Sequence, residues 1–256
     1  MFKTINFVFL SFLALLVTNA QAVVTPNPSA PTIIAKSYIL QDFDSGRIVA
    51  EQNSDQRLPP ASITKLMTAY VVSQELHMGN IKLEDEVLIS EKAWRMVGSR
   101  SFIEVNTKVS VEVLLRGMII QSGNDAAVAL AEHIAGSEET FAQMMNQYAQ
   151  QLGMFNTNYQ NSTGLPGNNH FTTARDIATL SAAIIRDFPE HYKWYAEKEF
   201  TYNNITQHNR NKLLWRDKSV DGLKTGHTEE AGYCLAASAK RSGMRLISVV
   251  LGTRSE

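Results

Sequence analysis

The order of strand and helix signals restricts the fold of this 256-residue chain more than any other feature. Two apolar runs in "SYILQDFDSGRIVAEQN" flank Asp44-Ser45-Gly46 and predict a β-hairpin. From about Lys82 to Phe188 the signals are mostly helical. Three strand-like segments then follow, "SVDGLKTG", "GYCLAASAK" and "RLISVVLGT", with Arg241-Ser242-Gly243 as their clearest hairpin connection. A hairpin, a mainly helical insert and a closing meander predict an α+β fold, an antiparallel sheet flanked by helices.

Within the mostly helical stretch from about Lys82 to Phe188, residues that favour helix ends mark the helix boundaries. Ser, Thr and Asn side chains accept hydrogen bonds from the free N–H groups of the first turn, and Gly tolerates the left-handed conformation that often follows the last turn. The predicted N-caps are Ser110, Asn124, Ser137 and Thr173, the last in a capping-box-like pair with Asp176, and the predicted stops are Gly136, Gly153 and Pro189.

The first 22 residues have the three-part pattern of a cleaved secretory signal. Lys3 precedes an apolar run over residues 7–17, and Ala20 and Ala22 are the small residues expected at −3 and −1. The run is shorter than the ~20 residues that span a bilayer, although an uncleaved anchor is the alternative. We therefore expect residues 1–22 to be a signal peptide, 23–34 a lead, and 35–256 one catalytic domain of an exported protein.

Composition excludes several classes of partner. Lys plus Arg is 24 and Asp plus Glu is 25, a balance that favours neither nucleic acid nor a membrane surface as a ligand. The one cysteine, Cys234, cannot close a disulfide within the chain, and its apolar setting "GYCLAASA" predicts a buried residue on a core strand. Stability must therefore come from a hydrophobic core, which a chain of this length can supply.

A lysine stands in an otherwise apolar helix. In "PPASITKLMTAYVV" an apolar stripe at helical spacing, with further apolar residues around it, predicts a helix packed on nearly all sides. Lys65 lies one turn after Ser62 on the same edge of this helix. Either the lysine extends its ammonium group to water, as an isolated helix would allow, or it has a chemical role beside the serine.

Two further short motifs favour the chemical role. Ser122-Gly123-Asn124 lies in "QSGND" and Lys224-Thr225-Gly226 in "LKTGHT", whereas the G-x-S-x-G, H-E-x-x-H, paired C-x-x-C and phosphate-loop motifs are absent and the six histidines are scattered. Ser-x-x-Lys alone is a weak signal. Ser-x-x-Lys, Ser-x-Asn and Lys-Thr-Gly in that order are the signature of penicillin-binding proteins and serine β-lactamases.

The chain resembles the low-molecular-mass penicillin-binding proteins of class C type, specifically the D-alanyl-D-alanine carboxypeptidases. The likeness extends through "LLRGMIIQSGNDAAVALAE", "NRNKLLW" and "VDGLKTGHT" to essentially the whole mature chain. It implies a β-lactamase/transpeptidase-like fold. It also implies a serine DD-carboxypeptidase that removes the terminal D-alanine of peptidoglycan pentapeptides through an acyl-enzyme on Ser62.

The residues themselves support a base at Lys65. A serine hydroxyl is a poor nucleophile until a base takes its proton, and an ordinary lysine is charged at neutral pH. Burial among apolar side chains and a second nearby cation both favour the neutral amine, and Lys224 is the candidate for that cation. The same logic predicts that Lys65 and Ser62 act as a pair.

The resemblance assigns the remaining roles. Ser122 would relay a proton to the leaving group, although capping a helix is the alternative for Ser122 and Asn124. Strict strand alternation would place Lys224 and Thr225 on opposite faces, so both can serve only if the strand edge twists. The expected substrate-binding residues are Asn124 for the substrate's amide, Arg210, Lys224 and Thr225 for its carboxylate, Gly226 for close backbone approach, and Ser62 and His227 for the oxyanion through their N–H groups.

The expected partners follow from this activity. They are the peptidoglycan stem peptide as substrate and β-lactam antibiotics as covalent inhibitors, in the periplasm, with no metal, no cofactor and no nucleic acid. A DD-endopeptidase on the same scaffold and a non-catalytic β-lactam- or peptidoglycan-binding module are the alternatives. Residues 161–199 lack the E-x-x-L-N element that class A β-lactamases use to activate water, which predicts a persistent penicilloyl adduct.

The end of the chain departs from the family pattern. Members normally continue into a helix that covers the sheet, a β-rich second domain and an amphipathic membrane anchor, and a further carboxylate-binding arginine would lie beyond Glu256. The expectation is therefore an incomplete C-terminal end, with an uncovered face on the strands from Asp221 to Thr253 and reduced solubility.

Overall fold

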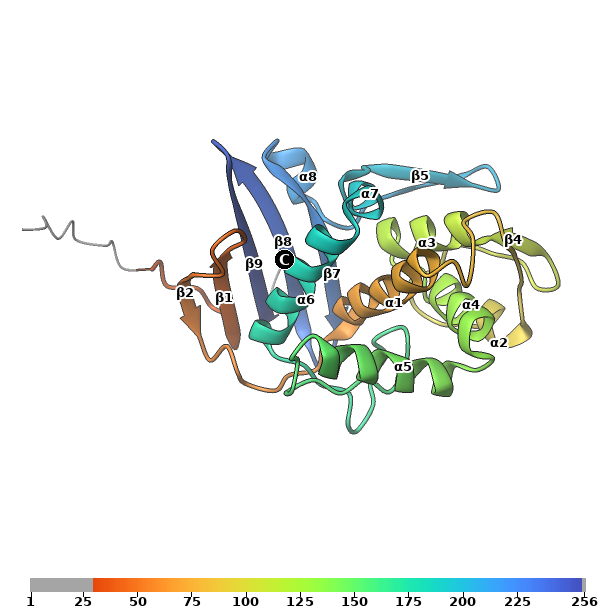
Figure 1. The fold of residues 1–256 in the computed structure, drawn as a ribbon, viewed down its shortest axis with the longest axis horizontal. Helices are drawn as coiled ribbons and strands as arrows, with labels where there is room; N and C mark the ends of the chain where they lie inside the picture. Colours follow the sequence, from red (N-terminus) through yellow and green to blue (C-terminus); the bar gives the residue numbers. More distant parts are fainter. Residues whose placement is uncertain (1–29, 255–256) are drawn as a thin grey trace, which may run out of the picture. The chain divides into compact units, whose positions relative to one another are not determined.

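Within residues 30–254, the part of the chain that this computed structural model describes, five strands form one antiparallel sheet in the order β2-β1-β9-β8-β7. The first strand pairs with the last, so both ends of the described domain meet in the sheet (Figure 1). The predicted signal peptide, residues 1–22, lies outside the described residues. The strands are β1 (Ser37–Asp42), β2 (Ile48–Gln52), β3 (Glu86–Leu88), β4 (Lys108–Ser110), β5 (Glu199–Tyr202), β6 (Ile205–His208), β7 (Val220–Thr228), β8 (Gly232–Arg241) and β9 (Met244–Thr253).

The insert between β2 and β7 is mainly helical, as the sequence predicts. Helix α6 packs on β1, β8 and β9, and α1 contacts α3, α4, α5 and α6, so α1 lies between the sheet side and the helical side of the domain (Figure 1). The helices are η1 (Ala61–Thr64), α1 (Lys65–His77), α2 (Glu91–Trp94), α3 (Val111–Ile120), α4 (Asn124–Ala135), α5 (Glu138–Gln151), α6 (Ala174–Asp187), α7 (Pro189–Tyr192), η2 (Lys193–Ala196) and α8 (Leu213–Arg216).

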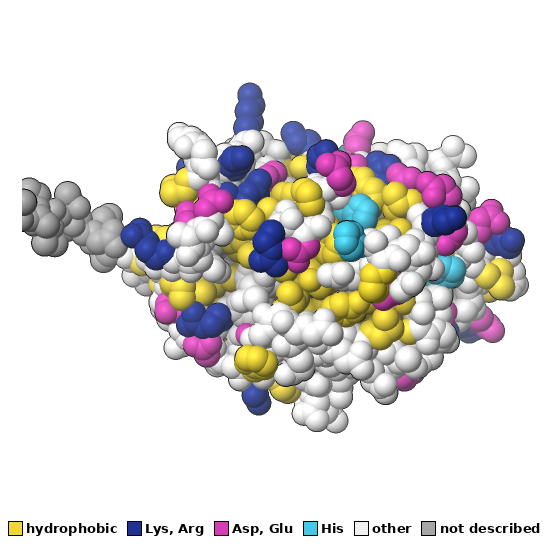
Figure 2. Space-filling view, in the orientation of Figure 1, with side chains coloured by type: hydrophobic (Ala, Val, Ile, Leu, Met, Phe, Trp, Pro, Cys, Tyr) yellow, Lys and Arg dark blue, Asp and Glu magenta, His cyan; other side chains and the backbone are white. Residues whose placement is uncertain are grey.

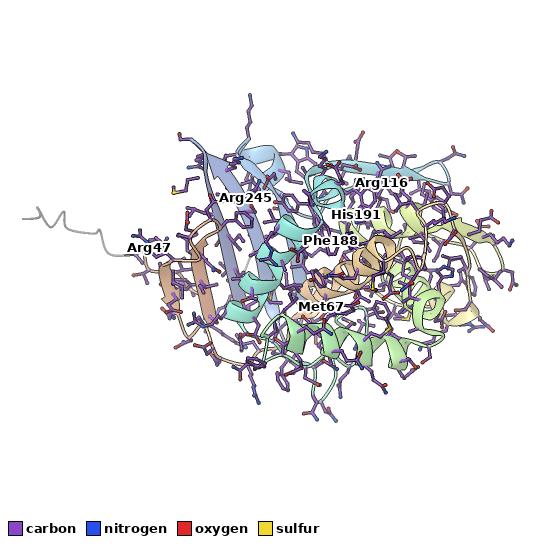
Figure 3. The ribbon with its side chains drawn as sticks, in the orientation of Figure 1. Arg47, Met67, Arg116, Phe188, His191 and Arg245 are labelled. Atoms are coloured by element: carbon purple, nitrogen blue, oxygen red, sulfur yellow. The ribbon has the colours of Figure 1, made fainter. Side chains whose placement is uncertain are left out.

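Helix α1 is the centre of the core. Every residue from Lys65 to Val72 is buried, which confirms the prediction of a helix packed on nearly all sides. Met67, labelled in Figure 3, is fully buried on it. Polar side chains at such positions need partners inside the protein, and this requirement fixes the surroundings of Lys65.

The predicted helix ends are confirmed with one exception. Ser110, Ser137 and Thr173 each accept a hydrogen bond from the N–H three residues on. Asn124 as a cap is wrong: Gly123 occupies the cap position of α4, and Asn124 is the first residue of the helix. Its side chain bonds to Lys65 and to the Val97 carbonyl oxygen and therefore does not cap the helix.

Two short antiparallel strand pairs were not predicted. β3 pairs with β4 inside the stretch that reads as helical, and β5 pairs with β6 ahead of the final strands. β5 and β6 form a hairpin whose turn is Asn203-Asn204, both with positive φ. Asn adopts this conformation more readily than most residues, so this pair was a hairpin signal.

The two faces of the sheet are packed differently. On β9, Ile247, Val249 and Leu251 are 0% exposed and lie on the face that α6 covers. Leu246 and Val250, which alternate with them, are half-buried on the opposite face. The strands therefore have one closed face and one partly open face.

Strand β7, which carries the Lys-Thr-Gly motif, is tied to the rest of the sheet by an ion pair. Arg245 of β9, labelled in Figure 3, contacts Asp221 of β7 at 2.7 and 2.8 Å and also donates to the Tyr192 hydroxyl at 3.2 Å. Both charges are partly buried, at 13% and 31% side-chain exposure. The contact holds the start of β7 against α7.

Charges of both signs are interspersed on the face of the molecule in Figure 2. Among the residues that the structure describes, no helix has both the length and the apolar character that crossing a membrane requires.

Candidate active site

Ser62 lies on the 3₁₀ turn η1, which leads directly into α1. Ala61 before it has φ +47°, a left-handed conformation that is strained for a residue with a Cβ. Two glycines approach the turn closely. A Cβ on Gly164 would lie 1.8 Å from the Ala61 carbonyl oxygen, and one on Gly226 would lie 3.1 Å from the Ser62 nitrogen. The turn is therefore fixed between a loop on one side and β7 on the other.

Lys65 is 1% exposed and its Nζ has three hydrogen-bond partners. These are Ser62 Oγ at 3.1 Å, Asn124 Oδ1 at 2.6 Å and the Thr163 carbonyl oxygen at 2.6 Å. Two of the three are carbonyl oxygens, which accept and cannot donate. A neutral amine has two N–H groups and one lone pair, so when both N–H groups bind carbonyls the lone pair is left for the Ser62 hydroxyl. This is the geometry of a base beside a nucleophile.

Electrostatics favours the neutral amine. Burial lowers the pKa of Lys65 well below its ordinary value, and the charge of Lys224 lowers it further, while Asp125 and Glu138 act in the opposite direction. Burial also lowers the pKa of Lys224, to about 7, with a further contribution from Arg210. The two causes acting on Lys65 are those that the sequence predicted.

The second motif sits at the start of α4. Ser122 is buried and has φ +69°, so a strained residue again occurs at the site. Asn124 gives its amide oxygen to Lys65 and donates through Nδ2 to the Val97 carbonyl oxygen at 2.6 Å. Asn124 is therefore a partner of Lys65 in this structure.

Six of the nine predicted site residues line one cleft of about 880 Å³. Those that line it are Ser62, Ser122, Arg210, Thr225, Gly226 and His227. The other three, Lys65, Asn124 and Lys224, are buried at 1%, 4% and 2% exposure. Lys65 touches Ser62 and Asn124 directly, and Lys224 lies within electrostatic reach of both Lys65 and Arg210.

The third motif lies on β7, an edge strand of the sheet. Lys224 pairs across the ladder with Ala236 and Thr225 with Leu235, so their side chains leave opposite faces, as strand alternation requires. Lys224 Nζ donates to the Thr225 carbonyl oxygen at 3.1 Å, so the side chain folds back along its own strand. The Lys224 ammonium therefore stays close to the strand that lines the cleft.

Arg210 is placed by the two asparagines beside it. Asn209 donates to the carbonyl oxygens of Tyr195 and Glu197, at 3.3 and 2.9 Å, and Asn211 donates to that of Gly222 at 3.1 Å. Both asparagines are buried. The "NRN" segment therefore clamps Arg210 between η2 and β7, with its side chain at the cleft.

Sequence reasoning missed one member of the site. The Thr163 carbonyl contacts Lys65 from a distant loop, and a backbone group leaves no side-chain signal in the sequence. The segment "NSTG" has the residues of a tight turn, but the sequence of a turn does not show which side chain its carbonyl groups contact. Nowhere in residues 30–254 do three or more His, Cys, Asp or Glu side chains gather in a way that could hold a metal ion.

Comparisons with known proteins show which family the chain resembles. A family model described as D-alanyl-D-alanine carboxypeptidase matches residues 24–255. The chain is 51% identical over 253 residues to D-alanyl-D-alanine carboxypeptidase DacA of Haemophilus influenzae, which covers 96% of this chain and 63% of that protein. It is 50% identical over 234 residues to DacC of Escherichia coli, with 89% and 58% covered. The chain thus spans about three fifths of the length of these curated relatives.

Solved structures of penicillin-binding proteins have a similar fold. Penicillin binding protein 5 from Haemophilus influenzae matches with a TM-score of 0.87 and 52% identity, over 89% of this chain and 68% of that chain. Penicillin-binding protein D2 from Listeria monocytogenes, in an ampicillin-bound form, matches with a TM-score of 0.80 and 29% identity, over 88% and 92%. These neighbours confirm the predicted β-lactamase/transpeptidase-like fold.

One more distant relative bears on the alternative activity. The D-alanyl-D-alanine endopeptidase of Pseudomonas aeruginosa is 34% identical over 256 residues, with 92% of this chain and 79% of that protein covered.

Proposed function

The chain belongs to the D-alanyl-D-alanine carboxypeptidase family, and from that premise we propose that it is a serine DD-carboxypeptidase that removes the terminal D-alanine from peptidoglycan pentapeptides. The observation that carries the proposal is the position of Lys65 Nζ, 3.1 Å from Ser62 Oγ with two carbonyl acceptors on its other side. A hydroxyl beside a buried, neutral amine is an activated nucleophile at neutral pH.

Acylation begins with proton transfer from Ser62 to Lys65 as Ser62 Oγ attacks the carbonyl carbon of the D-alanyl-D-alanine bond. Negative charge then develops on the carbonyl oxygen, and the backbone N–H groups of Ser62 and His227 are the proposed donors to it. The close approach of Gly226 to the Ser62 turn supports this pairing, because it brings β7 next to the turn.

Collapse of the tetrahedral intermediate breaks the peptide bond. The departing D-alanine amine needs a proton, and Ser122, on the lining of the cleft, relays it from the Lys65 ammonium. A water molecule then attacks the acyl-enzyme ester, with Lys65 again accepting a proton, and free Ser62 is restored. The net reaction is hydrolysis of one amide bond.

Substrate binding is assigned to the strand side of the cleft. Lys224, Thr225 and Arg210 bind the terminal carboxylate, which is the group that a carboxypeptidase must recognise. An extended peptide can add to the free edge of β7 through main-chain hydrogen bonds. The amide of Asn124 has one N–H left for the substrate's own amide beyond its bonds to Lys65 and Val97.

The remaining proposals concern location and inhibitors. We assign residues 1–22 as a signal peptide and the domain from residue 35 as catalytic, which places the enzyme in the periplasm, where its peptidoglycan substrate lies. β-Lactams, which resemble the D-alanyl-D-alanine end, are the expected covalent inhibitors. The ampicillin-bound relative supports this expectation.

The test compares products from a pentapeptide and from a cross-linked peptide dimer. Release of D-alanine from the pentapeptide by the parent, and none by Ser62→Ala, supports the carboxypeptidase. The matched control is Ser45→Ala, an exposed serine on the first hairpin, which should behave as the parent does.

Two results would contradict the proposal. Cleavage of the dimer in preference to the pentapeptide would establish the endopeptidase, the activity for which the Pseudomonas aeruginosa relative is named. Binding without turnover, unchanged by Ser62→Ala, would indicate a non-catalytic module.

A further inference from the structure

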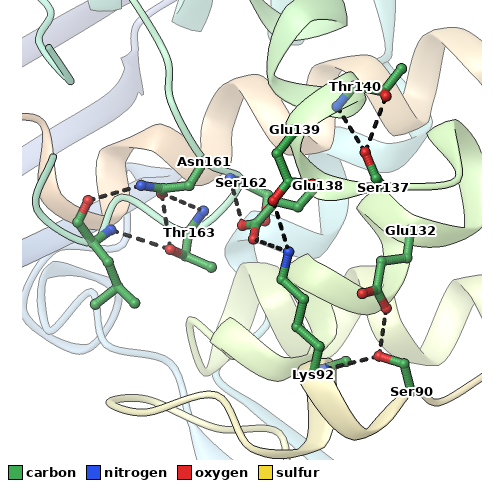
Figure 4. A network of polar contacts seen from close by, with 12 residues as sticks. Ser90, Lys92, Glu132, Ser137, Glu138, Glu139, Thr140, Asn161, Ser162 and Thr163 are labelled. Atoms are coloured by element: carbon green, nitrogen blue, oxygen red, sulfur yellow. Dashed lines mark hydrogen bonds and ion pairs between the residues drawn. The ribbon is translucent and has the colours of Figure 1, made fainter.

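Glu138, the first residue of α5, has a carboxylate that joins segments far apart in the sequence. Its side chain is 11% exposed. Glu138 Oε1 accepts from the Ser162 N–H at 3.1 Å and from the Ser162 hydroxyl at 2.8 Å, and Oε2 lies 3.2 Å from Lys92 Nζ (Figure 4). A carboxylate so little exposed is costly unless its charge is paired and its oxygens accept hydrogen bonds, and both conditions hold here.

The segment that Glu138 holds, residues 161–164, is a tight loop. Asn161 Oδ1 accepts from the Thr163 N–H at 3.1 Å, the Thr163 hydroxyl at 3.0 Å and the Gly164 N–H at 2.7 Å (Figure 4). Thr68 of α1 donates to the Ser162 carbonyl oxygen at 2.7 Å. The loop is thus closed by its own asparagine and attached to two helices, to α1 through Thr68 and to α5 through Glu138.

The position of this loop decides the orientation of Lys65. The Thr163 carbonyl is one of the two acceptors that occupy the N–H groups of the neutral Lys65 amine, at 2.6 Å. If the carbonyl moved by about 1 Å, one N–H would be released and the amine could rotate its lone pair away from Ser62. A misplacement of about this size can cost an enzyme on the order of 10²-fold in rate.

We propose that Glu138, paired with Lys92, is a positioning residue that holds the 161–164 loop so that the Thr163 carbonyl directs the lone pair of Lys65 at Ser62. Glu138 acts through Ser162 and Thr163. The kinetic consequence rests on the proposed function, whereas the orientation of Lys65 concerns the free protein.

The chain supplies a matched control beside Glu138. Glu139 also pairs with Lys92, at 3.3 Å, but its side chain is 75% exposed and its contacts do not include the loop. Glu139→Gln therefore removes a charge from the same lysine without touching residues 161–164.

The first experiment measures the rate of acylation of Ser62 by a fluorescent penicillin in each variant, with the affinity of the initial complex fitted separately. We expect Glu138→Ala to slow acylation about tenfold or more, with the affinity of the initial complex changed less than about threefold. Glu138→Gln, which keeps an oxygen acceptor for Ser162, should retain most of the parental rate. Glu139→Gln should equal the parent.

A second variant covers the case in which Glu138→Ala does not fold. Ser162→Ala removes the hydroxyl bond to Glu138 and keeps the backbone bond, and we expect a loss of about threefold or more. Parental acylation in Glu138→Ala, or in Ser162→Ala where the first does not fold, overturns the proposal. Equal losses in Glu138→Ala and Glu138→Gln also overturn it, because the charge and not the hold on the loop would then matter.

A readout independent of activity is the ¹³Cε resonance of Lys65, assigned by its absence in Lys65→Arg. It should move in Ser162→Ala, which keeps every charge, and move further in Glu138→Ala than in Glu138→Gln, since both of these remove the Glu138 charge that acts on Lys65. In Glu139→Gln it should stay at the parental position. If the parent forms no penicillin adduct, the proposed function fails, and this resonance still decides the positioning of Lys65. An unmoved resonance in both loop variants contradicts the inference.

Discussion

The two walls of the cleft hold their charged groups in different ways. The helical wall consists of the Ser62 turn and Ser122. Behind it, Asn124 of α4 and the Thr163 carbonyl of the 161–164 loop surround Lys65 with acceptors at 2.6 Å. The strand wall consists of β7 and Arg210, and it presents Thr225 and Arg210 to the cleft. On the side proposed to make and break bonds, the hydrogen-bonding groups have partners within the protein. On the side proposed to bind, the side chains face the cleft, where the substrate can contact them.

The same contrast appears in the two lysines. Burial lowers the pKa of both, but Lys65 is held by Asn124 and Thr163, whereas Lys224 folds back on the Thr225 carbonyl. A fixed, neutral amine suits a base, and a buried cation held against the strand that lines the cleft suits a carboxylate. Substituting one lysine at a time should therefore affect different kinetic constants.

The largest effect is expected for Lys65→Arg. The variant keeps a positive charge, but a guanidinium group does not give up its proton at accessible pH, so Ser62 loses its base. We expect acylation by a fluorescent penicillin to fall by about 10³-fold or more, within the range of general-base contributions. Circular dichroism and the melting temperature control for folding. Acylation at a near-parental rate in a folded variant would make Lys65 structural and remove the contrast between the walls.

A large difference is also expected between two rates of the parent protein, formation and hydrolysis of the penicilloyl ester. Of the residues that line the cleft in the described part of the chain, none is Asp or Glu, and Glu190 and Glu197 pair with Lys193 and Arg116. Lys65 lies against Ser62 Oγ in the geometry of acylation, and no carboxylate in the described lining is placed to activate water on a penicilloyl ester. Hydrolysis of the penicilloyl ester should therefore be slower than its formation by about 10²-fold or more.

Denaturing electrophoresis after incubation with a fluorescent penicillin measures this persistence. A labelled band that is present in the parent and absent in Ser62→Ala supports it. Rapid turnover of penicillin without a labelled band would place a second water-activating group at the site and group the protein with the β-lactamases.

The sequence predicted the strands and the three motifs better than it predicted the tertiary contacts that orient the motif side chains. The hairpin around Ser45, the closing meander and the caps at Ser110, Ser137 and Thr173 depend on local turn and capping chemistry, which a sequence displays directly. The orientation of Lys65 depends on a backbone carbonyl that lies 98 positions away along the chain. Tertiary packing alone brings that group into place.

The pairing of β3 with β4 shows the same limit at the level of the fold. Its strands are three residues each and lie inside a stretch with helical signals on both sides, so neither strand is long enough to show a period of two. Asn124 was assigned to the wrong local role for a related reason. Its position suits a cap, and its partner Lys65 comes from another helix.

A smaller effect than that of Lys65→Arg is expected for Lys224→Met, and it sharpens the contrast between the walls. A charge-assisted hydrogen bond to the substrate carboxylate contributes about 1.5–3 kcal/mol, so the variant should raise KM roughly 10- to 150-fold. Lys240→Met, an exposed lysine of the same sheet, is the control. A loss confined to kcat, with KM unchanged, would contradict a binding role for Lys224.

The pH profile of kcat/KM separates the two lysines further, because it reports the free enzyme. Lys224, with its pKa lowered to about 7, carries its charge below that pH and loses it above, so kcat/KM of the parent should fall as the pH rises through about 7. On the acid side kcat/KM falls when Lys65 takes up a proton. The Lys224 cation lowers the pKa of Lys65, so Lys224→Met should raise that pKa and move the acid limb to higher pH while the fall near pH 7 disappears. If the pH profile of Lys224→Met had the same shape as that of the parent, the charge of Lys224 would not control the pKa of Lys65.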